Sequence, residues 1–237
     1  MSQRTLDQRM LGVGTALTDH TITASDVISF ADVGASNAIK RDTVQGVLDL
    51  AGGGGLIFIA GVDASTASTV EFVHGTGGVV IDSTYDVYQI EICDITPSAS
   101  AAFHVRVSDD AGTSWEQGGT DYDLAATEAH NTSGGGNSNQ FTNAGSSSWQ
   151  LNDNSTSNNM GTTGDSHWKI SIAKPSSTTS PKMMLFAGIV ADNTPTMHHL
   201  HGGGLFHGNT NAINGFQMYP STGTITGSFR LYGIAKS

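Results

Sequence analysis

Four of the nine histidines in this chain lie within ten residues of one another, at His198, His199, His201 and His207. Imidazole nitrogen is a good ligand for iron, nickel and zinc. Side chains alternate along a strand, so in a strand His199 and His201 project from the same face. Three copies of the chain around a threefold axis would then bring six imidazoles together.

The same histidines have a plainer interpretation, as a polar strand that faces solvent or a subunit contact. No cysteine or carboxylate stands beside them to complete a metal site within one chain. We therefore expect no resident cofactor, and a transition metal held by His199 and His201 at a threefold axis is the alternative.

Other reactive residue types do not fall into a catalytic motif. No serine lies in a Gly-x-Ser-x-Gly sequence. The pairs Asp109/Asp110 and Asp121/Asp123 are of the residue type that glycosidases use, but neighbouring acids in turns are usually solvated or cap backbone amides. Two glycine runs lack the lysine and the strand–loop–helix context of a phosphate loop. We predict that the protein is not an enzyme.

One turn has a specific pattern, Ser-x-Asp-x-Gly-x-x-Trp, which spans Ser108 to Trp115 and resembles the Asp-box of sialidase propellers. In such a turn Asp110 caps backbone amides and Gly112 takes a positive φ. Propellers repeat the motif blade by blade, whereas it occurs once here. The pattern therefore predicts a capped turn and no sialidase site.

The tryptophans are candidates for binding sugars. Trp149 and Trp168, with Trp115 and Tyr122, would form a stacking platform if they were exposed. Aromatic side chains with this much apolar surface are more often packed in a core. We keep Trp149 and Trp168 as candidate binding residues for host glycans.

Composition excludes several classes of protein. The chain has 237 residues, a net charge of −11 and only 13% charged residues, so a nucleic-acid groove is not expected. No apolar stretch approaches the roughly 20 residues of a membrane span, and we expect no contact with a membrane. A single cysteine, Cys93, excludes an intramolecular disulfide and favours synthesis in a reducing cytoplasm.

Most of the chain predicts strands that are separated by Gly-, Asn-, Ser- and Thr-rich turns, which favours a mainly β fold, a jelly-roll-like β-sandwich. The expected strands are Leu56–Ala60, Ser68–Val73, Asp86–Cys93, Ala102–Val107, His167–Ile172, Met183–Val190, Ala212–Tyr219 and Ser228–Ile234. Met183–Val190 is apolar on both faces, as expected of a central strand. By contrast, we predict a long Ser/Asn/Gly-rich loop over residues 127–164, ordered by neighbouring subunits.

The first 51 residues differ from the rest and form a predicted N-terminal anchor. An extended segment is expected at Asp26–Asp32 and one short amphipathic helix at Asp42–Leu50. The irregularly spaced apolar residues Leu6, Met10, Leu11 and Val13 suit a segment that folds against a partner. Residues 52–55 are four glycines, which predict a hinge before the sandwich at 56–237.

Several segments are similar to known virion proteins. Thr23–Asp32 and Asn37–Leu50 resemble the N-terminal attachment regions of tailed-bacteriophage fibre, spike and capsid-decorating proteins. Tyr85–Ile92, Ser108–Trp115 and Gly223–Ile234 resemble parts of the β-sandwich domains that follow such regions. The resemblance covers most of the chain outside the predicted loop.

This resemblance implies a bacteriophage virion structural protein, usually a homotrimer, that docks on a capsid or tail protein through its N-terminus. It implies no catalytic residues. The chain is short and has no repetitive shaft, so we favour capsid decoration or a head fibre. A tail fibre or receptor-binding protein that recognises host-surface glycans is the alternative.

Overall fold

A computed structural model describes residues 27–32, 38–43, 55–132, 135–152, 159–163, 165–194 and 196–234. Contacts divide the chain into Met1–Gly53 and Gly54–Ser237, and the division falls within the predicted glycine hinge. In the first unit, β1 (Val27–Asp32) pairs antiparallel with β2 (Ala38–Thr43). The extended segment predicted at Asp26–Asp32 is therefore a strand over its described residues, Val27–Asp32.

Two predictions for the first unit fall on residues that the structure does not describe. They are the anchor side chains Leu6, Met10, Leu11 and Val13, and the helix over Asp42–Leu50 except for its first two residues. Those two, Asp42 and Thr43, end β2. Both predictions therefore remain predictions.

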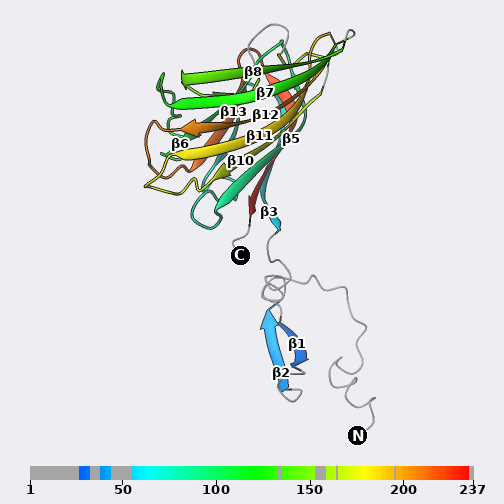
Figure 1. The fold of residues 1–237 in the computed structure, drawn as a ribbon. Helices are drawn as coiled ribbons and strands as arrows, with labels where there is room; N and C mark the ends of the chain where they lie inside the picture. Colours follow the sequence, from blue (N-terminus) through cyan, green and yellow to red (C-terminus); the bar gives the residue numbers. More distant parts are fainter. Residues whose placement is uncertain are drawn as a thin grey trace, which may run out of the picture. The chain divides into compact units, whose positions relative to one another are not determined.

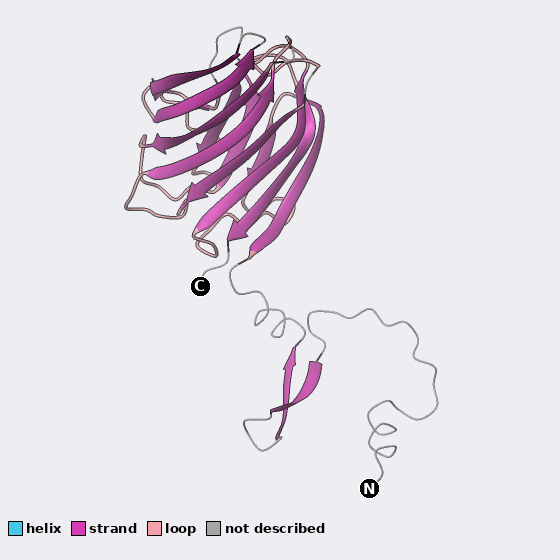
Figure 2. Cartoon of the chain, turned by 45° about the vertical axis from the view of Figure 1, so that its right-hand side comes forward, coloured by secondary structure: helices cyan, strands magenta, loops and turns pink. Residues whose placement is uncertain are grey.

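The second unit is a β-sandwich of two antiparallel sheets, as predicted (Figures 1 and 2). Every strand expected from the sequence is present. The larger sheet consists, in spatial order, of β3 (Leu56–Ala67), β14 (Ile225–Ile234), β5 (Val87–Pro97), β10 (Ser166–Ala173), β11 (Lys182–Ala191), β12 (Met197–Phe206), β7 (Tyr122–Thr132) and β8 (Gly135–Ser146). The smaller sheet consists of β4 (Val70–Val73), β13 (Gly215–Pro220), β6 (Phe103–Ser108) and β9 (Trp149–Gln150).

The strand order is that of a jelly roll with two additions. Strands β3, β14, β5 and β10 form one four-stranded half, and β4, β13, β6 and β9 form the other, so the first and last strands pair. The hairpin β7–β8 is inserted between β6 and β9, and the pair β11–β12 is inserted between β10 and β13. Both insertions join the larger sheet beyond β10 and double its width (Figure 1).

The prediction of a loop over residues 127–164 is wrong for much of that range. β7 continues to Thr132, and β8 pairs with it from Tyr122/Ser146 to Thr132/Gly135. β8 is an edge strand whose side chains are nearly all exposed, so its Ser, Asn and Gly residues carry no alternation of apolar and polar types. Its strand form comes from the backbone ladder with β7, which composition does not reveal.

Aromatic side chains from both sheets meet in the core. Tyr122 of β7 packs edge-on against Trp149 of β9, and Phe103 of β6 stacks on Trp168 of β10. Each indole also lies over a glycine: Trp168 over one on the paired strand β11, and Trp149 over one on β12 in the opposite sheet. A Cβ at Gly188 would clash with the Trp168 ring, and a Cβ at Gly204 would stand 2.5 Å from that of Trp149. The glycines in these strands therefore make room for buried indoles.

The turn after β6 has the predicted capping hydrogen bonds and the predicted glycine conformation. Asp110 Oδ1 accepts hydrogen bonds from the Ser114 amide at 2.9 Å and the Ser108 hydroxyl at 2.8 Å, and these bonds hold the pKa of Asp110 below its usual range. Gly112 has a φ of 76°. The Asp-box pattern is thus a structural turn.

Among the described residues, no helix has the length and hydropathy to cross a membrane.

Candidate functional site

The outer face of the larger sheet carries apolar side chains that no other described residue covers. In β11 alternate residues point inward and outward, and the outward ones include Met183, Leu185 and Ile189. Their exposed fractions are 64%, 68% and 44%, respectively. The sequence predicts burial on both faces of this strand, but in the single chain only the inner face is buried. The outer residues are therefore available to a partner.

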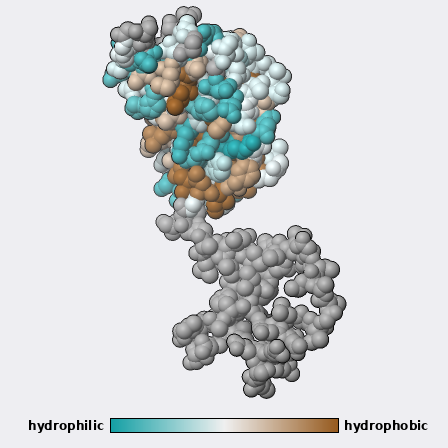
Figure 3. Space-filling view, turned by 90° about the vertical axis from the view of Figure 1, so that its right-hand side faces the viewer, coloured by the Kyte–Doolittle hydropathy of each residue, from teal (hydrophilic) through white to brown (hydrophobic). Residues whose placement is uncertain are grey.

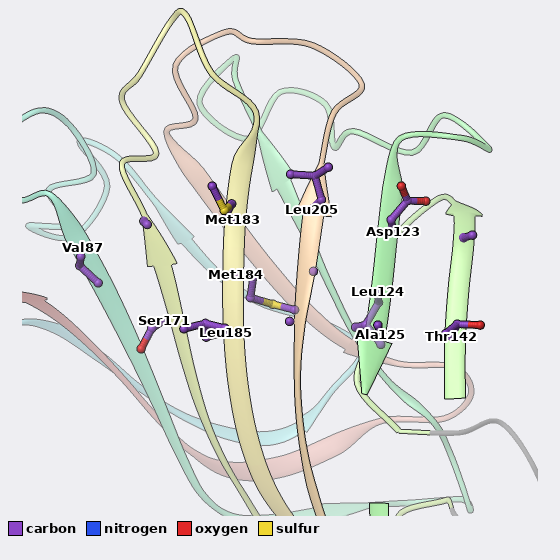
Figure 4. Close-up of a pocket in the computed structure, with 14 residues that line it drawn as sticks. Val87, Asp123, Leu124, Ala125, Thr142, Ser171, Met183, Met184, Leu185 and Leu205 are labelled. Atoms are coloured by element: carbon purple, nitrogen blue, oxygen red, sulfur yellow. The ribbon is translucent and has the colours of Figure 1, made fainter. Parts of the chain in front are cut away.

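Next to Leu185 the outer face has a depression, because the neighbouring residues are small. A depression of about 670 Å³ lies between Met183 and Leu185 of β11 and Leu205 of β12, where Ala125 and Gly203 provide the floor (Figure 4). Met183 is directly opposite Leu205 in the pairing of β11 with β12. The lining is almost entirely apolar, so the hollow suits a hydrophobic side chain better than a sugar or a phosphate.

The outward positions of β10, β11 and β12 carry no carboxylate. Besides apolar and small residues they hold Ser171 and four groups that can be cationic: His167, Lys169, His199 and His201. A chain with 21 acidic residues would repel a second copy over most of its surface. The face formed by β10, β11 and β12, called here the outer face, avoids that repulsion.

His199 and His201 lie on the outer face, as the strand periodicity predicts. Both are exposed, and their ring centroids are 5.7 Å apart. His201 Nε2 is 2.8 Å from the hydroxyl of Thr127 on β7. The structure contains one chain, so the threefold metal site that the sequence suggests for this pair stays a prediction.

A second exposed apolar group lies at the start of β3. Leu56, Ile57 and Phe58 are 48%, 41% and 58% exposed, and the Phe58 ring packs edge-on against Tyr232 of β14. Figure 3 shows hydrophobic residues gathered at the lower end of the sandwich, the end at which β3 begins in Figure 1. This group is separated from β11 by β14, β5 and β10.

The candidate sugar-binding residues are not at the surface. Trp149 is 0% exposed and Trp168 is 3% exposed, because each indole fills the space between the two sheets. The prediction that Trp149 and Trp168 bind glycans is therefore wrong. Their size and apolar character predicted burial equally well, and burial is what occurs.

A buried group of acids and histidines lies on the inner face of the inserted strands. Glu128 and His130 of β7 and His198 of β12 place one potential ligand atom each within 4.8 Å of one another, which could hold a metal ion. Sequence analysis selected His199 and His201 and missed this group. His198 faces inward, and Glu128 is 70 residues away in the chain, so only the pairing of β7 with β12 brings them together.

His198 stands between two carboxylates. Its Nδ1 is 2.5 Å from Glu128 Oε1, and its Nε2 is 3.3 Å from Asp192 Oδ2. Burial acts to lower the pKa of His198, but the hydrogen bonds to Glu128 and Asp192 outweigh it, so that pKa is raised. Asp192 in turn accepts hydrogen bonds from the amides of Thr194 and Thr196.

Comparison with known proteins does not assign this chain to a family. No protein-family model matches it, and no curated protein matches it at a significant level. Among solved structures, the binding domain of botulinum neurotoxin DC, in complex with rat synaptotagmin II, aligns with 92% of this chain and 50% of its own, at 9% identity. The TM-score is 0.19, which supports no conclusion about fold or function.

Proposed function

We propose that this protein is a non-enzymatic structural protein of a bacteriophage virion, in which three copies associate through the outer face of the larger sheet. The observation that carries the association is the exposed, carboxylate-free apolar surface of β10, β11 and β12. The sequence resemblance to phage fibre and decoration proteins supplies the virion context.

The outer face reaches the size of a stable contact together with its neighbours β7 and β8. These five strands, at a spacing of about 4.8 Å and with about ten residues each, offer roughly 800 Å² per copy. The two added strands bring one carboxylate, Asp123, to the edge of the hollow. Stable interfaces bury about that area on each partner. Leu185 and Met183 of one copy are then the natural occupants of the hollow on the next copy, because its lining is apolar.

Attachment to the particle is assigned to the unit Met1–Gly53. The contacts between residues divide this unit from the sandwich. The partner is a capsid or tail protein. Deletion of the first twenty residues should leave a folded, associated sandwich that no longer joins particles. Normal incorporation of the truncated protein would contradict the assignment of the anchor.

We favour capsid decoration or a head fibre over a tail fibre. Electron microscopy of particles labelled through a C-terminal tag distinguishes these roles. Label scattered over the shell is the expected result, and label at a single vertex would place the protein on the tail. The receptor-binding alternative loses its candidate residues, because both Trp149 and Trp168 are buried.

A further inference from the structure

The two inserted hairpins, β7–β8 and β11–β12, meet at a buried polar group, which lies outside the eight strands of the jelly roll. Glu128 and His198 are 1% and 2% exposed, although both belong to residue types that are rarely so deeply buried. His198 is directly opposite His130 in the pairing of β12 with β7, and Glu128 lies two residues before His130 on the same face. Three side chains from two strands thus point at one buried spot.

We infer that Glu128, His130 and His198 bind a divalent first-row transition ion of the Zn²⁺ class, which ties the two inserted hairpins together. Two imidazole nitrogens and one carboxylate oxygen, with water as a fourth ligand, are a ligand set that Zn²⁺ takes. Nitrogen ligands argue against Ca²⁺ and Mg²⁺, which prefer oxygen.

One separation between the ligand atoms already fits such an ion, and a second is too short. Bonds of about 2.0–2.1 Å in tetrahedral geometry place two ligand atoms about 3.4 Å apart. His130 Nδ1 is 3.4 Å from Glu128 Oε1. His198 Nδ1 is nearer, at 2.5 Å from the same oxygen, so the ion requires that pair to separate by about 1 Å.

The orientation of each imidazole supports the assignment independently. His130 Nδ1 is buried and makes no hydrogen bond, although Glu128 Oε1 stands 3.4 Å away; a buried polar atom without a hydrogen bond is costly unless a ligand satisfies it. His198 turns its other nitrogen, Nε2, to Asp192. A carboxylate in that place fixes the ring and its tautomer, so that Nδ1 can bind a metal ion. Asp192 is therefore a positioning residue.

The test uses the purified full chain, stripped with a chelator and titrated with Co²⁺, which gives intense visible absorption when four-coordinate. We expect one Co²⁺ per chain, paramagnetic shifts in the His130 and His198 ring resonances, and a higher melting temperature with Zn²⁺. His130→Asn should remove the absorption. Asp192→Asn should weaken binding by about 10- to 100-fold.

The matched control is the double substitution His199→Asn and His201→Asn, which changes two histidines of the same strand on the opposite face. It should keep the 1:1 absorption. A folded wild-type chain that develops no such absorption overturns the inference. The inference is also overturned if the double variant loses the absorption while His130→Asn keeps it. The paramagnetic shifts locate the ion in the wild-type chain, even if a substituted chain fails to fold.

Discussion

Acidification should destabilise the sandwich through one histidine, His104. This residue lies on β6, where its ring stacks on Tyr219 with centroids 5.1 Å apart and its Nδ1 is 2.9 Å from the Ser148 hydroxyl. Burial and, to a smaller extent, the positive charge of Arg106 together lower the pKa of His104 to about 4. The folded chain therefore keeps this imidazole neutral well below pH 6.

The sign of the effect follows from proton binding. The unfolded chain takes up a proton near the ordinary histidine pKa of 6.5, whereas the folded chain does so only near 4. Stability from this group is thus complete above pH 6.5, falls as the pH drops, and is lost below pH 4. One pKa unit corresponds to about 1.4 kcal/mol, so the full loss is about 3 kcal/mol, of which about 2 kcal/mol has occurred at pH 5.

The assay compares the wild type with His104→Gln, which cannot titrate but can still hydrogen bond to Ser148. Urea unfolding at pH 8 and pH 5, at one protein concentration, gives the free energy of unfolding. The wild type should lose about 2 kcal/mol more than the variant over this interval. Equal losses in the two proteins would refute the reasoning, because every other titrating group is shared.

Two further predictions concern packing. Gly188→Ala should lower the free energy of unfolding by about 1–3 kcal/mol in chemical denaturation, because the new Cβ meets the ring of buried Trp168. Gly136→Ala, where the nearest atom is at 3.8 Å, should change it little, and equal effects would contradict the packing argument. Lys182→Met should lower the melting temperature, as measured by calorimetry. The reason is that the buried ammonium donates hydrogen bonds to the carbonyls of Ser177, Ser180 and Thr210. An unchanged melting temperature would show that those carbonyls need no partner.

The strands of the jelly roll were predictable because their sequences alternate. Trp168, Ile170 and Ile172 of β10 are buried and Lys169 and Ser171 between them are not, as the period of two requires. The insertion β7–β8 escaped prediction because β8 has no buried face, and because the inner positions of β7 change from Leu124 to the polar Glu128. Backbone pairing with β7 specifies β8, whereas β7 is also held by its core residues Tyr122 and Leu124.

The candidate site was predictable only in part. The spacing of His199 and His201 correctly predicts that both lie on one face of a strand. It could not reveal that His198, the residue before this pair, meets Glu128, since that contact depends on which strand pairs with β12. For the same reason the sequence could not show that the apolar outer residues of β11, such as Leu185, are left exposed by the rest of the described chain.

Sedimentation equilibrium of the wild type and two leucine variants tests the proposed association most directly. Leu185→Glu places a charge at the centre of the outer face, whereas Leu56→Glu makes the same change at an exposed leucine of β3. At micromolar concentration the wild type and Leu56→Glu should sediment at three times the chain mass of 24.6 kDa, and Leu185→Glu at the chain mass itself. A wild-type chain that sediments as a monomer, or a Leu185→Glu variant that remains a trimer, would contradict the proposal.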